Sequence, residues 1–170
     1  MRLTGKQTYD VFLSYRRSDG KLLARLLKES LEKQGYRVFL DMDELLDGVF
    51  DERVLQAIES APIFLLLMTP HVCNRCSHEK DWVRMEIACA IRSKKTIVPV
   101  NPDNRFKRFS SSLPVHLHDV LAVHQYSVVD TGQLYQESVA KLIRERIQPT
   151  IKHNKLKKYF RWLPFRGEVS

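Results

Sequence analysis

The stretch Ile63-Phe64-Leu65-Leu66-Leu67-Met68 decides the fold class, because every position in it is apolar. A strand that is apolar on both faces belongs in the middle of a sheet that is covered on both sides. The longest apolar run, residues 61–68, is eight residues long. A helix that crosses a bilayer needs about 18 or more apolar residues. We therefore expect a central strand here and no transmembrane segment in the chain.

On the N-terminal side of this strand, the apolar pattern alternates between the periods of strands and helices. Tyr9 to Ser14 and Arg37 to Leu40 are typical of strands. Between them, residues 21–34 form a predicted helix that Gly35 ends. A further helix is expected to begin at Asp51 and Glu52, whose carboxylates suit a first helical turn.

On the C-terminal side, the pattern predicts a helix over about residues 80–93 and a strand over 96–100, whose Pro99 favours a place near the sheet edge. Residues 101–120 are rich in loop formers, with one short helix. A fifth strand is expected over 121–126. The last helix is marked by apolar residues at helical spacing, namely Leu134, Val139, Leu142, Ile143 and Ile147.

Five strands that alternate with helices predict an α/β fold, a flavodoxin-like five-stranded parallel sheet with helices on both faces. Residues 1–149 form this predicted domain, and 150–170 form a C-terminal tail or linker. Ligands of such sheets bind beyond the carboxyl ends of the strands. Three segments follow those ends: residues 15–20, residues 41–48, and the region from Thr69 into the helix that carries Trp82 and Glu86.

The chain carries 28 Lys and Arg against 20 Asp and Glu, a net charge of +8. Residues 150–170 hold six of the basic side chains and one acid, so the other 149 residues carry only 22 basic against 19 acidic side chains. No specific nucleic-acid role is expected for the body. The tail mixes its charges with aromatic residues, which suits a membrane, a nucleic acid or another subunit. A helix extension or linker is the favoured interpretation, since Pro164 and Gly167 interrupt a long helix.

Three cysteines, an odd number, and the lack of an apolar leader at the N-terminus favour a reducing, cytoplasmic environment. His71, Cys73, Cys76 and His78 have the ligand types of a zinc site, but four ligands within eight residues are more crowded than in most structural sites. Reduced loop thiols are the expected state, with no metal. Asp10 is expected to be a structural carboxylate.

The segments after the strands resemble the signature of Toll/interleukin receptor (TIR) domains over residues 8 to about 147. Residues 9–17 resemble the first family box, and 38–48 resemble the second strand and its BB loop. Trp82 and Glu86 are similar to the Trp-x-x-x-Glu motif of NAD-cleaving members, such as those of animal axon degeneration and bacterial antiphage defence. Glu44 departs from the animal pattern, which has a lysine there.

The resemblance implies an NAD glycohydrolase or cyclase with Glu86 as catalytic residue. It implies that NAD is bound by Tyr15, Arg16, Arg17, Asp41, Phe50 and Trp82, with NAD as substrate and no separate cofactor. Glu86 would stabilise the oxocarbenium charge, and Arg16 and Arg17 suit the pyrophosphate. The product is ADP-ribose or a cyclic isomer, which the sequence does not distinguish.

The alternative function is a non-catalytic TIR adaptor. Self-association through the BB loop, Asp41 to Gly48, is expected in either case. A phosphoacceptor receiver shares the predicted topology but needs an aspartate at the end of the third strand, where this chain has Met68-Thr69-Pro70. The sequence therefore disfavours that third function.

Overall fold

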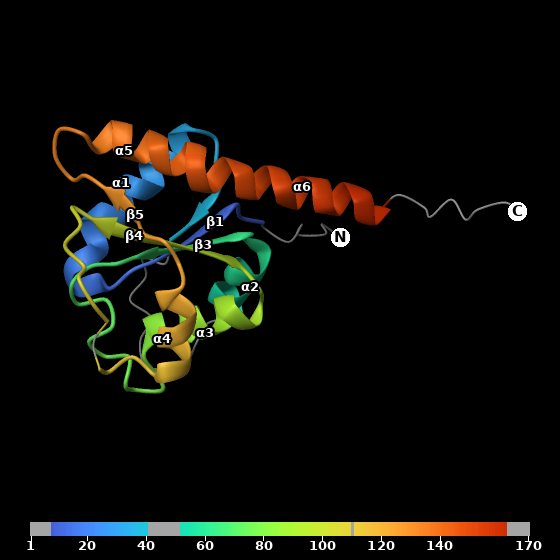
Figure 1. Cartoon of the computed structure of the whole chain (residues 1–170). Coiled ribbons are helices and arrows are strands. Elements are labelled where there is room, and N and C mark those ends of the chain that lie inside the picture. The colour runs from blue at the N-terminus through green and yellow to red at the C-terminus, as the bar shows by residue number, and fades with distance from the viewer. Residues whose placement is uncertain (1–7, 41–51, 110, 163–170) are drawn as a thin grey trace, which may run out of the picture.

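The computed structural model describes residues 8–40, 52–109 and 111–162, and these form a five-stranded parallel sheet with helices on both faces (Figure 1). The strand order is β2-β1-β3-β4-β5. The strands are β1 (Val11–Ser14), β2 (Val38–Phe39), β3 (Ile63–Leu67), β4 (Thr96–Pro102) and β5 (Ser127–Val129). The helices are α1 (Arg17–Lys33), α2 (Glu52–Ser60), α3 (Trp82–Arg92), α4 (Val115–Ala122), α5 (Tyr135–Leu142), the π-helix η1 (Ile143–Ile147) and α6 (Gln148–Trp162).

The central position predicted for residues 63–68 is confirmed. All five residues of β3 are buried, and the strand pairs in parallel with β1 on one side and β4 on the other. Alternate residues of β3 enter two separate cores. Phe64 and Leu66 pack with α2, α3 and α4, whereas Ile63, Leu65 and Leu67 pack with α1, α5 and η1.

Helix α1 begins at Arg17, four residues before the predicted start, so it starts almost directly after β1. Its buried face carries Ala24, Leu27 and Leu31, while Leu22 and Leu26 are exposed. Gly20 lets the first turn lie close to the sheet, since a Cβ atom there would be 3.3 Å from a methyl group of Leu67. The first turn of α1 is therefore held near the carboxyl ends of β1 and β3.

The fourth strand was predicted near the sheet edge, and β4 lies second from the edge, between β3 and the edge strand β5. It is thus an inner strand. Pro99 nevertheless has a neighbouring strand on only one side. It pairs with Leu66 of β3, and the pairing with β5 begins at Val100. The missing N–H of proline is tolerated at such a position.

The fifth strand predicted over 121–126 is wrong, because α4 extends through Ala122 and β5 begins at Ser127. Leu117 and Leu121, one helical turn apart, are both buried. Packing of this pair explains why the apolar segment continues the helix.

The predicted last helix is longer than expected. Val139, Leu142, Ile143 and Ile147 lie in helices, as predicted, and are buried, but Leu134 is 55% exposed and precedes the helix. The chain continues through η1 into α6, which reaches beyond the sheet in Figure 1. Residues 150–162 of the expected tail are thus helical.

Asp10 is a structural carboxylate, as predicted. It accepts a 2.8 Å hydrogen bond from the amide of Arg37 and lies 3.3 Å from the Nε of the same residue. These contacts join the start of β1 to β2.

Candidate active site

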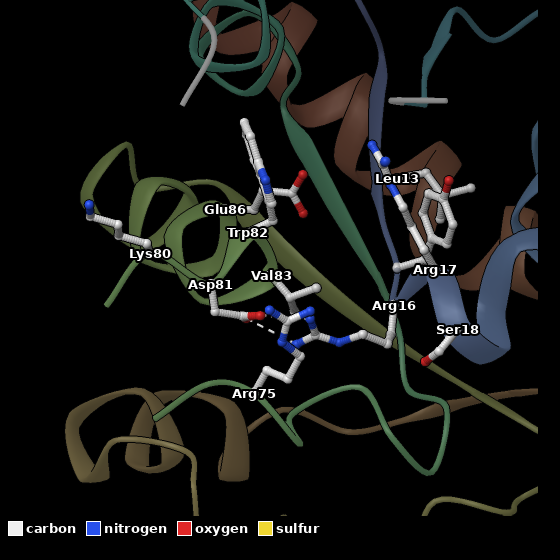
Figure 2. Close-up of a pocket in the computed structure, with 11 residues that line it drawn as sticks. Leu13, Arg16, Arg17, Ser18, Arg75, Lys80, Asp81, Trp82, Val83 and Glu86 are labelled. Atoms are coloured by element: carbon white, nitrogen blue, oxygen red, sulfur yellow. Dashed lines mark hydrogen bonds and ion pairs between the residues drawn. The ribbon is translucent and has the colours of Figure 1, made fainter. Parts of the chain in front are cut away.

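A cavity of about 320 Å³ lies at the carboxyl end of β1, between the start of α1 and the first turns of α3 (Figure 2). It is lined by Leu13, Tyr15, Arg16, Arg17, Ser18, Arg75, Lys80, Asp81, Trp82, Val83 and Glu86. Five of the predicted site residues, Tyr15, Arg16, Arg17, Trp82 and Glu86, therefore meet around one cavity. Asp41, Phe50 and the expected BB loop lie outside the described residues.

Glu86 is a buried carboxylate, 7% exposed, on the cavity wall. Its Oε2 atom accepts a 2.6 Å hydrogen bond from the hydroxyl of Ser14, the last residue of β1. A short hydrogen bond from a hydroxyl to a carboxylate is a strong one and fixes the orientation of the acceptor. Sequence reasoning placed Ser14 in a family box but assigned it no role.

Trp82 and Glu86 are four residues apart on α3 and project from one face of the helix, as Figure 2 shows. The spacing predicted this, because residues i and i+4 are neighbours on a helix surface. Trp82 is half-buried and also packs against the hydrophobic core. It therefore serves both the cavity wall and the core.

Arg16 is held in an ion pair rather than presented freely to the cavity. Its Nη1 and Nη2 atoms lie 2.6 and 3.0 Å from the two carboxylate oxygens of Asp81, in a bidentate arrangement. Nε and Nη2 also donate to the carbonyl oxygen of Val72 at 3.1 and 2.8 Å. Arg16 therefore joins β1 to the segment after β3 and to the start of α3.

Asp81 is the N-cap of α3, and its side chain accepts a 3.1 Å hydrogen bond from the amide of Arg84. Burial alone would raise the pKa of Asp81, but the hydrogen bonds from Arg16 and from this amide hold the pKa below its ordinary value. Burial likewise opposes the charge of Arg16, and Asp81 nevertheless raises the pKa of the guanidinium. Both groups are charged at neutral pH.

A second carboxylate ties α1 to the segment after β3. Asp19, in the first turn of α1, accepts hydrogen bonds from the hydroxyl of Thr69 at 2.9 Å and from the amide of His71 at 3.1 Å. Sequence reasoning missed Asp19, Asp81, Arg75 and Lys80 as site residues. Of these, Asp81 had a local signal, since aspartate directly before a helix is a common N-cap.

The four candidate zinc ligands do not converge. Cys73 and Cys76 are buried, while His71 and His78 are exposed. The Cys76 thiol hydrogen-bonds to Cys73, which lowers the pKa of Cys73 and raises that of Cys76. No group of three or more His, Cys, Asp or Glu side chains in the described ranges could hold a metal ion. All three cysteines are free thiols.

Comparison with known families gives a match to the TIR domain model over residues 11–143. The chain belongs to the TIR domain family. NAD(+) hydrolase tir-1 of Caenorhabditis elegans is 36% identical to this TIR domain over 154 residues, which cover 84% of the chain and 15% of the relative. NAD(+) hydrolase SARM1 of Danio rerio is 36% identical over 139 residues, 79% of the chain and 19% of the relative. The chain thus spans less than a fifth of the length of these two relatives.

Solved TIR structures share the fold of this domain. The metazoan TIR-STING receptor from C. gigas matches with a TM-score of 0.55 and 18% identity, over 84% of this chain and 41% of that one. The TIR domain of the Toll-related receptor TRR-2 from Hydra magnipapillata matches with a TM-score of 0.50 and 18% identity, over 86% and 98%. Each described helix of the present chain is too short or too polar to pass through a lipid bilayer.

Proposed function

We propose that this TIR domain cleaves the bond between nicotinamide and ribose in NAD. The observation that carries the proposal is the position of Glu86, a buried carboxylate oriented by Ser14 on the wall of a cavity shared with Trp82. The names of the two NAD(+) hydrolases at 36% identity support it. The products would be nicotinamide and either ADP-ribose or a cyclic isomer, serving as an immune or cell-death signal.

The chemistry requires one carboxylate. The bond between ribose C1′ and the positively charged nicotinamide nitrogen breaks, and its electron pair leaves with nicotinamide, which departs neutral and needs no proton. The ribosyl fragment becomes an oxocarbenium cation. The negative charge of Glu86 stabilises this cation most strongly where water is excluded. Water then attacks C1′ and loses a proton to give ADP-ribose, whereas attack by a group of the same molecule gives a cyclic product.

NAD is the substrate in this proposal, and no separate cofactor takes part. Trp82 would stack against an aromatic ring of the substrate. Tyr15, which follows β1, and Arg17, the first residue of α1, would contact it together with Asp41 and Phe50. Arg16 would act indirectly, because its guanidinium already binds Asp81 and Val72.

Self-association through residues 41–48 is proposed as the way copies of the domain assemble, in a cytoplasmic setting that suits three free thiols. A non-catalytic adaptor, the alternative function, would assemble in the same manner but release no nicotinamide. If assembly completes the active site, activity per molecule will rise with protein concentration. A constant specific activity over a wide concentration range would contradict that coupling.

The proposal is tested by incubating the purified domain with NAD and identifying the products by mass spectrometry. We expect nicotinamide in equal amount to ADP-ribose or a cyclic isomer, and loss of both with Glu86→Ala. Intact NAD after prolonged incubation at high protein concentration would favour the adaptor. The mass of the second product separates hydrolysis from cyclisation, because the cyclic isomer lacks one water.

A further inference from the structure

Among the residues that the structure describes, the cavity is lined by more positive than negative side chains. Its cations are Arg16, Arg17, Arg75 and Lys80, and its carboxylates are Asp81 and Glu86. Asp81 is paired with Arg16. In the proposed reaction Glu86 faces the cationic end of the substrate, which leaves Arg75 and Lys80 to be explained. The described part of the cavity lining therefore carries two cations, Arg75 and Lys80, that the proposed chemistry at Glu86 does not use.

Arg75 differs from Arg16 in that its charge is not neutralised within the described residues. Its side chain is exposed and makes no ion pair with a described carboxylate, although it lines the cavity. Figure 2 shows it reaching from the segment after β3 toward the Arg16–Asp81 pair. Lys80 lines the same cavity but extends away from that pair.

The turn that carries Arg75 is held on both sides by other guanidinium groups. Arg16 donates two hydrogen bonds to the carbonyl oxygen of Val72. Arg84 donates from Nη1 to the carbonyl oxygens of Cys76 and Ser77 at 3.3 and 3.1 Å. Because these contacts order the backbone before and after Arg75, little backbone entropy is lost when its side chain binds a ligand.

We propose that Arg75 binds the diphosphate of the substrate, taking the role that the sequence suggested for Arg16. A guanidinium presents its donors as a planar fork that suits phosphate oxygens, and charge-assisted hydrogen bonds of this kind are strong. The two ends of the cavity then match the two charges of NAD: Glu86 faces the nicotinamide ribose, and Arg75 faces the diphosphate. This inference rests on the proposed function, since it names a binding residue for the same substrate.

The inference is tested by isothermal titration calorimetry of ADP and adenosine, two probes that differ only in the diphosphate. Wild-type protein should bind ADP more tightly than adenosine. Arg75→Gln should weaken ADP binding by about tenfold or more, as expected for loss of a charge-assisted hydrogen bond, and should leave adenosine binding unchanged. Arg75→Lys keeps the charge but loses the fork, so its affinity for ADP should be intermediate.

The matched control is Arg92→Gln, which removes an exposed arginine from the last turn of α3, outside the cavity. It should bind ADP as the wild type does. The inference is overturned if Arg75→Gln binds ADP within twofold of wild type, if it weakens ADP and adenosine equally, or if wild-type protein binds no ADP at millimolar concentration. Binding is measured without turnover. Thus ADP binding through Arg75 without nicotinamide release would refute the proposed function and leave the inference standing.

Discussion

The hydroxyl of Ser14 donates a 2.6 Å hydrogen bond to Oε2 of Glu86, which joins the end of β1 to the middle of α3. Serine and glutamate are 1% and 7% exposed, respectively. A buried carboxylate that is oriented in this way has few alternative positions. The geometry of the proposed catalytic group is thus set by a strand and a helix, both rigid elements of the fold.

Replacement of Ser14 by alanine should reduce kcat for NAD cleavage by about tenfold, the effect of roughly 1.4 kcal/mol on the barrier, with KM little changed. The reason is that Glu86 keeps its charge but loses the donor that orients it. Steady-state assay of nicotinamide release measures both constants. Ser30→Ala is the matched control, because it removes a serine that shares a 3.1 Å hydrogen bond with Tyr135 on the other face of the sheet. Equal kcat values for Ser14→Ala and wild type would contradict the role of Ser14.

Asp81→Asn should lower the free energy of unfolding at neutral pH by about 1–3 kcal/mol, because the guanidinium of Arg16 loses its charged acceptor. The pKa of Asp81 is lowered in the folded protein. Its contribution is therefore fully present above about pH 4, the ordinary value for aspartate, and is lost as the pH falls toward the lowered pKa. Urea unfolding at several pH values should show a smaller loss of stability on acidification in Asp81→Asn than in wild type. Identical pH profiles would show that the ion pair contributes nothing.

Trp82→Phe should retain most of the packing against the core but reduce the contact with substrate. We expect its free energy of unfolding to stay within about 1.5 kcal/mol of wild type, while KM for NAD rises. Trp82→Ala should lose stability as well as activity, because the half-buried ring packs against the hydrophobic core. Denaturant titration and steady-state kinetics separate the two effects. An unchanged KM in Trp82→Phe would contradict the expected loss of substrate contact and would show that phenylalanine can replace Trp82 in the cavity wall.

Removal of metal ions should change neither stability nor activity. Cys73 and Cys76 are buried next to Arg16 and Asp81, while His71 and His78 are exposed, so the four side chains do not face a common point. We expect an unchanged melting temperature after treatment with a chelator, and zinc far below one equivalent in the purified protein. A stoichiometric metal whose removal lowers the melting temperature would show that these residues rearrange around it.

The sequence pattern predicted the elements whose signals are local. Trp82 and Glu86 share a helix face because of their spacing, and residues 63–68 form a central strand because they are apolar throughout. The fifth strand was predicted too early in the chain, because the helix there depends on the tertiary packing of Leu117 and Leu121. The local sequence does not show that packing. Pro99 is tolerated in an inner strand because the pairing of β4 with β5 starts one residue later.

The ion pair of Arg16 with Asp81 joins residues 65 positions apart in the sequence, and the hydrogen bond from Ser14 to Glu86 spans 72 positions. Contacts between residues so far apart cannot be predicted from the spacing of residues within one segment of the sequence. For this reason the sequence suggested phosphate binding for Arg16, whereas in the structure the guanidinium of Arg16 forms an ion pair with Asp81. Arg75 had no signal in the sequence, because its place beside the cavity depends on how the segment after β3 folds back toward β1.

The proposed role of Glu86 in the cleavage of NAD depends on its negative charge, and Glu86→Gln isolates the effect of that charge. This substitution keeps the size of the side chain and an oxygen that can accept from Ser14, but removes the negative charge. Glu137→Gln, which neutralises an exposed carboxylate in the first turn of α5, is the matched control. We predict that nicotinamide release from NAD falls by about two or more orders of magnitude in Glu86→Gln, while Glu137→Gln releases nicotinamide at the wild-type rate. Undiminished release from Glu86→Gln would show that the charge of Glu86 does not drive the cleavage.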